Sequence, residues 1–296
     1  MIFDRSYFKK SAAILVISAF LSIFSNTPLY AMEAGSAPPF ALITIPKSGS
    51  HMLIKALHLL TGGISVWHTR FPSFYTIPSN EGFLYTHFCL SPQLERDYKE
   101  LAKLKKIISI RDLRDVCVSI VYQIRKSVWP GLSHEEWMAF RRLSFDEQLN
   151  FVINYEYDVE EIAKKAPNSL QVSVSKVAAQ AIQYCNDSNN LVCKYEDLVG
   201  AVGGGSDELQ MRKLRDIAKF LEISISESRL QEIAMSLYGD GFNPFGKEGF
   251  KNYGSTFKNG KIGSWKSAFN EENKIAFKMK LGQALIALGY EQDDRW

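Results

Sequence analysis

The chain has 296 residues, which is enough to bury a sizeable core in one large domain or two small ones. Its hydrophobic content of 46% and its charged content of 23% are ordinary for a globular protein. The formal net charge of +3 is too small to indicate a nucleic-acid partner or an anionic membrane surface. The function therefore has to be inferred from motifs.

The first 31 residues have the pattern of a secretory signal peptide. Arg5, Lys9 and Lys10 form a basic start, and the apolar run 12–24 follows them. That run is shorter than the roughly 18 residues of a membrane span, which favours a cleaved signal over an uncleaved signal-anchor. We therefore expect a secreted, periplasmic or luminal protein, with a signal-anchored membrane protein as the alternative. A linker is expected over 32–39 and the folded domain over 40–296.

A strand, a tight loop and a helix are predicted at the start of this domain. Apolar residues 41–45 indicate the strand, and the helical spacing of apolar residues after Ser50 indicates the helix. Backbone N–H groups at such a helix N-terminus can bind an anion. Lys47 adds a positive charge, and Gly49 permits a close approach of the backbone. The loop is therefore a candidate cradle for phosphate or sulfate, and a polar turn without a ligand is the alternative.

The order of residues in this loop differs from that of a Walker A P-loop. The Walker A motif places its lysine after two glycines that are separated by four residues. Here Lys47 precedes Gly49, and no glycine lies earlier in the loop. A P-loop kinase or NTPase is therefore kept only as an alternative function.

The rest of the chain alternates predicted strands and helices. Strands are expected at 83–88, 106–110, 170–174 and 190–196, helices at 93–106, 113–125, 207–221 and 226–236 and after Ser133, and a loop or short strands at 64–80. This order predicts an α/β fold with a mostly parallel central sheet flanked by helices. Ligands of such sheets bind beyond the carboxyl ends of the strands. The side chains expected at or just past those ends are Lys47, His87, Arg111 and Glu196.

Two groups of side chains leave alternatives open. The aromatic residues between Trp129 and Tyr157 are expected in the core, with an apolar acceptor pocket as the alternative. The cysteines Cys89, Cys117, Cys185 and Cys193 lack metal-ligand spacing, and Cys117 is expected to be a buried small hydrophobe. A disulfide between Cys185 and Cys193 is an open alternative for an oxidising compartment.

Four segments resemble, in the same order, motifs of the sulfotransferases that use 3′-phosphoadenosine 5′-phosphosulfate (PAPS). Residues 46–50 resemble the loop that holds the 5′-phosphosulfate, and Arg111 followed by Ser119 resembles the 3′-phosphate motif. Residues 194–198 resemble the Tyr-Glu-Asp segment, and residues 257–266 resemble the C-terminal closing loop. The likeness thus covers nearly the whole domain and implies a P-loop-like nucleotide-binding fold.

The resemblance also implies roles for individual residues. His87 would be the catalytic base, and Lys47 would contact the bridging and sulfuryl oxygens. The other residues expected to bind PAPS are Ser48, Gly49, Ser50 and His51 on the 5′ side, Arg111, Ser119, Lys258, Asn259 and Gly260 at the 3′-phosphate, and Tyr195 at the adenine. PAP would be the product, and no metal is implied.

The chemistry of sulfuryl transfer requires these residue types. Negative charge develops on the leaving and equatorial oxygens, so cations and N–H donors placed there lower the barrier. A base whose pKa lies near the working pH removes the proton of the attacking hydroxyl. We therefore expect in-line transfer to a hydroxyl or amine of an unidentified small molecule, glycan or peptide.

Several positions depart from the family pattern. Met52 replaces a tryptophan, Tyr85 and Asn259 replace lysines, and Ser264 replaces an aspartate. A nucleotide-binding protein of the same fold that has lost turnover is therefore a further alternative. The dimerisation segment of many cytosolic members is not recognisable, so the oligomeric state is open.

Overall fold

The computed structural model describes residues 37–62, 65–68, 82–87, 103–126, 132–156, 173–239 and 260–296, with the backbone alone for the second and third of these ranges. They belong to one compact unit, residues 35–296. The predicted signal peptide and most of the linker lie outside the described residues, as do Cys89, Lys258 and Asn259. Within the described part of the chain, no helix is both long and apolar enough to span a membrane.

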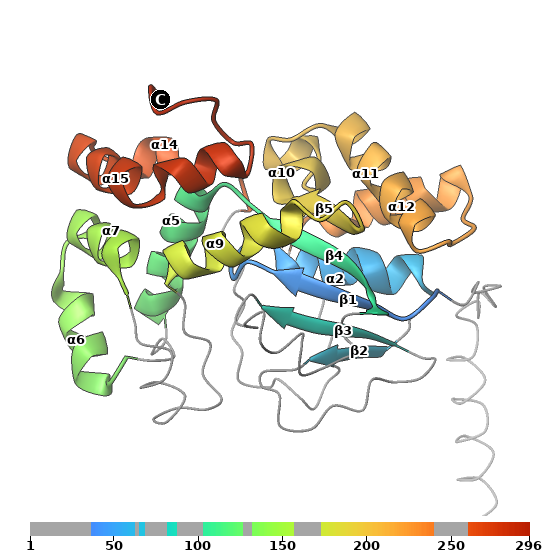
Figure 1. Ribbon diagram of the computed structural model, residues 1–296, viewed down its shortest axis with the longest axis horizontal. Helices are drawn as coiled ribbons and strands as arrows, with labels where there is room; N and C mark the ends of the chain where they lie inside the picture. Colours follow the sequence, from blue (N-terminus) through green and yellow to red (C-terminus); the bar gives the residue numbers. More distant parts are fainter. Residues whose placement is uncertain are drawn as a thin grey trace, which may run out of the picture. The chain divides into compact units, whose positions relative to one another are not determined.

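Within these ranges, five parallel strands form one sheet in the order β2-β3-β1-β4-β5 (Figure 1). The strands are β1 (Phe40–Thr44), β2 (Ser65–His68), β3 (Gly82–His87), β4 (Lys105–Ile110) and β5 (Asn190–Lys194). The strand order reverses between β1 and β4, which is the position where open α/β sheets bind their ligands. Thr44, at the end of β1, is in register with His87 of β3 and with Ser109 of β4. The carboxyl ends of these three strands therefore lie side by side.

Helices cover both faces of the sheet (Figure 1). They are α2 (Ser50–Leu60), α5 (Leu113–Lys126), α6 (His134–Arg142), α7 (Phe145–Asn154), α9 (Val174–Cys185), α10 (Tyr195–Leu198), α11 (Asp207–Phe220), α12 (Glu227–Leu237), α14 (Trp265–Ala268) and α15 (Glu271–Ala287). A short 3₁₀ helix, η1 (Ala201–Gly203), precedes α11.

The alternation of side chains along the strands produces two hydrophobic cores. Ile43 and Ile108 face the core formed with α5, α7, α9 and α15. Leu42 and Ile107 face the opposite core, formed with α2, α11 and α12. Because β1 is buried along its whole length, its sequence is a continuous apolar run rather than an alternating one.

Most predicted elements are confirmed, and three need correction. The strand expected over 190–196 ends at Lys194, because Tyr195 and Glu196 begin α10. The helix expected over 93–106 is wrong at its end, because Lys105 and Lys106 begin β4. Lys105 can enter the strand because its ammonium donates to the Phe220 carbonyl and pairs with Glu222 at the surface. The strand expected over 170–174 is wrong at Val174, which starts α9, while 170–172 lie outside the described residues. The Ser173 hydroxyl caps this helix by accepting the N–H of Lys176, and this cap outweighs the β-propensity of valine.

The described aromatic residues of the 129–157 region lie in the core, as expected. Phe140 is buried, and its neighbours Trp137, Phe145, Phe151 and Tyr155 pack against the core of α5 and α7. Cys117 is fully buried, also as expected. Cys185 and Cys193 are free thiols, so the structure does not contain the disulfide that was left open between them.

Candidate active site

The loop between β1 and α2 folds back tightly on the end of β1. The N–H of Ser48 donates to the carbonyl of Ile45 at 3.1 Å. Lys47 and Gly49 both have left-handed backbone conformations, with φ values of 69° and 83°. The Ser48 hydroxyl lies 3.0 Å from that of Ser109 on β4. The loop is thus fixed from beneath by the neighbouring strand.

The start of α2 presents backbone donors. The Ser50 hydroxyl is used internally, because it donates to Thr44 Oγ1 at 2.9 Å. The backbone N–H groups of Gly49 and Ser50 have no acceptor in the part of the chain that the structure describes. Donors of this kind at a helix N-terminus can bind an anion. The predicted cradle therefore has its donors in its backbone, whereas the hydroxyls of Ser48 and Ser50 fix the loop.

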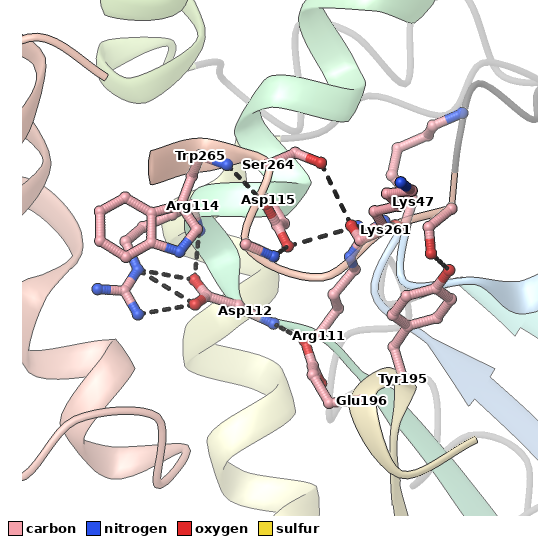
Figure 2. Close-up of polar contacts among 12 residues, drawn as sticks. Lys47, Arg111, Asp112, Arg114, Asp115, Tyr195, Glu196, Lys261, Ser264 and Trp265 are labelled. Carbon is pink, nitrogen blue, oxygen red and sulfur yellow. Dashed lines mark hydrogen bonds and ion pairs between the residues drawn. The ribbon is translucent and has the colours of Figure 1, made fainter. Parts of the chain in front are cut away.

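Arg111, directly after β4, contacts this loop and a distant segment at the same time (Figure 2). Its Nη1 donates to the Lys47 carbonyl at 3.4 Å, and its Nη2 donates to the Lys261 carbonyl at 3.0 Å. Its Nε is buried and lacks a hydrogen-bond partner among the described residues. Arg111 thus brings together two segments that the motifs assign to opposite ends of one nucleotide.

Tyr195 packs its ring between the loop and Arg111. The guanidinium carbon of Arg111 lies 4.3 Å from the centre of the ring. A Cβ atom at Gly49 would lie only 2.3 Å from Tyr195 Cδ2, so the ring can lie there only beside a glycine. The hydroxyl of Tyr195 donates to the carbonyl of Gly260. Burial raises the pKa of Tyr195 to about 12, so this donor remains protonated at neutral pH.

Asp115 is the residue of this site that the motifs did not single out. Its carboxylate accepts the N–H groups of Gly263 and Trp265 at 2.8 and 2.9 Å, and it lies 3.5 Å from Arg111 Nη2. Asp115 therefore holds the segment 260–265 against the guanidinium (Figure 2). Its spacing of four residues from Arg111 was the available signal, because such pairs meet on one helix face.

Two other cations, Arg111 and Lys126, lie near Lys47. Its Nζ donates to Gln123 Oε1 of α5 at 3.3 Å. Burial, followed by repulsion from Arg111 and Lys126, lowers the pKa of Lys47 to about 8. An incoming anion would relieve both effects. The charge of the ammonium therefore depends on pH near neutrality, and an anion beside it would favour the charged form.

Ser119 lies on the helix face that borders this site. It is partly buried and occupies the row of α5 between Asp115 and Gln123, both of which contact site residues. His51 lies in the first turn of α2, and His87 ends β3 opposite Thr44. The side chain of His87 lies outside the described residues, as do Lys258 and Asn259. In the described part of the chain, no group of three or more His, Cys, Asp or Glu residues could hold a metal ion.

A comparison with protein families identifies the family of the chain. The model of the sulfotransferase domain matches residues 37–289. The chain belongs to the sulfotransferase family. This match confirms the family and the enzyme class, a PAPS-dependent sulfotransferase, that the four motifs predicted.

One solved structure shows the same fold, and two others match with lower scores. The mouse sulfotransferase SULT7A1 in complex with PAP is 18% identical, with a TM-score of 0.56, and the match covers 83% of this chain and 84% of that one. Retinol dehydratase, in one complex with androsterone and inactive cofactor PAP and in another with retinol and PAP, is 15% identical, with a TM-score of 0.48 in both. Those matches cover 83% of this sulfotransferase and 80% and 81% of the retinol dehydratase chains. No curated protein sequence matched.

The contact between Gly49 and Tyr195 can be tested by adding one methyl group. Gly49→Ala should lower the free energy of unfolding by about 1–3 kcal/mol more than Gly204→Ala does, because its Cβ would overlap the ring. Gly204 is the matched control, since it is also left-handed and a Cβ there would meet nothing closer than 4.0 Å. Urea denaturation measures both changes. Equal losses would contradict the packing described for Tyr195.

Proposed function

We propose that this sulfotransferase transfers the sulfuryl group of PAPS to a hydroxyl or amine by in-line attack. The observation that carries the proposal is the position of Arg111, which contacts the loop of Lys47, the ring of Tyr195 and the segment 260–265. These are the segments that the family motifs assign to the 5′-phosphosulfate, the adenine and the 3′-phosphate. Residues far apart in the sequence thus meet at one guanidinium, which supports a single site for one doubly phosphorylated adenosine.

On the 5′ side, the proposed donors are the Lys47 ammonium and the backbone N–H groups of Gly49 and Ser50. In sulfuryl transfer, charge moves onto the bridging oxygen as the bond to sulfur breaks. A cation and fixed N–H dipoles at that oxygen stabilise the transition state more than the ground state. Lys47 is supported by Gln123, which holds its Nζ at 3.3 Å.

On the 3′ side, Arg111 and Ser119 are the proposed phosphate ligands. The buried Nε of Arg111, which lacks a partner among the described residues, supports this role because a buried donor is costly unless an acceptor satisfies it. Lys258, Asn259 and Gly260 are proposed to complete this end. Binding at a phosphate that does not react positions the sulfuryl group for attack.

His87 is the proposed general base. The carboxyl end of β3 lies beside that of β1, after which the loop of Lys47 begins. A histidine there can remove the proton of an attacking hydroxyl near neutral pH. The acceptor is proposed to be a small molecule, a glycan or a peptide. Export of the protein, proposed from its N-terminal sequence, would require PAPS to be delivered to the same compartment.

The proposed cofactor can be tested by thermal denaturation with nucleotides. PAP at about 100 times its Kd should raise the free energy of unfolding by about 2.7 kcal/mol, and AMP at the same concentration should have a smaller effect. ATP with Mg²⁺ serves as the control for a kinase or NTPase. A larger stabilisation by ATP than by PAP would contradict the proposal.

The 3′-phosphate site can be tested with Ser119→Ala, which removes one hydroxyl from a partly buried helix position. PAP affinity should fall by about tenfold, because a hydrogen bond to a charged group is lost, and AMP affinity should not change. Calorimetric titration of both nucleotides gives the comparison. An equal loss for AMP would show that Ser119 does not contact the 3′-phosphate.

The charge on Lys47 predicts a pH dependence of binding. Since its pKa is about 8 in the free protein, the ammonium is mostly charged at pH 7 and mostly neutral at pH 9. If PAP binds the charged form, its affinity should fall by about tenfold between these pH values, with proton uptake near pH 8. Lys47→Arg stays charged and should show a flat profile. Identical profiles for the two proteins would contradict the role of Lys47.

The proposed base is tested with His87→Ala. Removal of a general base should lower the rate of sulfuryl transfer by about 100- to 10,000-fold, while PAP binding is retained. Transfer from radiolabelled PAPS to a panel of hydroxyl and amine acceptors measures the rate, and calorimetry measures binding. Full activity in the variant would refute the base, and absence of transfer by the native protein to every acceptor would favour an impaired nucleotide-binding protein.

A further inference from the structure

Residues 289–296, which we call the strap, contact the segment that carries Tyr195. The carbonyl of Gly289 accepts Lys194 Nζ at 2.9 Å, and the Tyr290 hydroxyl donates to Glu196 Oε2 at 2.9 Å. Lys194 and Glu196 are the two sequence neighbours of Tyr195. The start of the strap therefore braces the segment that carries the tyrosine of the site.

The other end of the strap contacts Arg114. The guanidinium carbon of Arg114 lies 3.9 Å from the ring centre of Trp265 and 4.4 Å from that of Trp296. Arg114 also pairs with Asp112 at 2.7 Å and with Glu291 at 2.6 Å. Its side chain is only 4% exposed, so these contacts are shielded from water and are stronger than surface pairs. Two strap residues thus converge on one buried arginine.

Trp265 connects Arg114 and Trp296 to the candidate site, because it contacts both of them and also binds Asp115. It ends the segment 260–265, and its N–H binds Asp115, which also pairs with Arg111 (Figure 2). Its ring meets the ring of Trp296 edge-on, with a distance of 5.6 Å between the centres. The segment 260–265 is therefore held by two sets of contacts. Asp115 accepts its N–H groups, and Trp296 and Arg114 pack against the ring of Trp265.

The segment 260–265 is held by side-chain hydrogen bonds and by one backbone bond to a distant residue, from the Ile262 N–H to the Gly203 carbonyl, rather than by regular secondary structure. Gly260 and Gly263 have left-handed φ values of 58° and 75°, and the segment has no strand pairing. Irregular segments with few backbone bonds open at low free-energy cost. If the segment already has its binding conformation before the ligand arrives, less free energy is lost in ordering it on binding.

We propose that Glu291 and Trp296 are positioning residues that hold the segment 260–265 in place for the nucleotide. They act through Arg114 and Trp265 and do not contact the nucleotide themselves. The inference rests on the proposed function, in which this segment closes over the 3′-phosphate. Residues 290–296 lie beyond the 37–289 match to the family, so the proposal concerns this chain's own residues.

The test compares three variants of the full chain. Trp296→Ala should raise the Kd of PAP by about tenfold, the effect of losing one well-packed cation–π contact. It should also speed hydrogen exchange at the N–H groups of Gly263 and Trp265. Trp296→Phe keeps an aromatic face and should restore most of both properties. Arg295→Ala is the matched control, because that neighbouring side chain is 86% exposed and pairs only with Asp293 among the described residues.

PAP affinity is measured well below the melting temperature of each variant, where nearly all of the protein is folded. Exchange at Gly263 and Trp265 is compared with exchange at the core amides of β1, which report any general loss of stability. If Trp296→Ala does not fold, Glu291→Gln replaces it and should shift both readouts in the same direction. Unchanged PAP affinity and unchanged exchange in a folded variant would overturn the inference. If the native protein does not bind PAP but the exchange rates still respond to Trp296→Ala, the proposed function fails and the holding role of the strap stands.

Discussion

The arrangement of the site depends on the contacts of the Arg111 guanidinium. Arg111 follows β4, yet its guanidinium donates to the carbonyl of Lys47 in the loop after β1. It also donates to the carbonyl of Lys261, which lies 150 residues further along the chain. The parallel sheet makes this possible, because β1 and β4 are neighbours and their carboxyl ends meet at one edge. Without the guanidinium, the loop of Lys47, the ring of Tyr195 and the segment 260–265 would lose the side chain that contacts all three.

The same contacts leave positive charge inside the protein. Lys47 and Arg111 lie close enough for each cation to disfavour the other, and Asp115 lies 3.5 Å from Arg111 as a counter-charge. Burial raises the pKa of Asp115, although Arg111 and two backbone N–H groups oppose that shift. Bringing these cations together is therefore electrostatically costly, and a ligand with several negative charges would offset that cost. This is a physical reason for a polyanion rather than a neutral molecule to bind there.

Much of this arrangement could be predicted from sequence. The apolar runs of β1 and β4 and the helical spacing after Ser50 fix the parallel sheet and the position of Lys47 at its edge. The motifs also named Arg111 and Tyr195, which the structure brings together. These predictions succeeded because they depend on periodicity and on local turn chemistry.

The rest depends on contacts between distant residues. Asp115 resembles any helix carboxylate until the segment 260–265 is seen to donate to it. Ser48 and Ser50 were predicted to bind PAPS, and no sequence pattern indicated that their hydroxyls bond to Ser109 and Thr44. The role of Arg114 between two tryptophans involves a residue more than 180 positions away, which no local pattern encodes.

The backbone of Lys47 carries one further consequence. A left-handed conformation costs a non-glycine residue about 1–2 kcal/mol, so this position would be more stable as a glycine. The lysine remains there at the expense of stability, since only a side chain can supply the ammonium. Under the role proposed for Lys47, consensus or stability-guided redesign should therefore leave residue 47 untouched, because at this position a firmer fold and a working enzyme call for different amino acids.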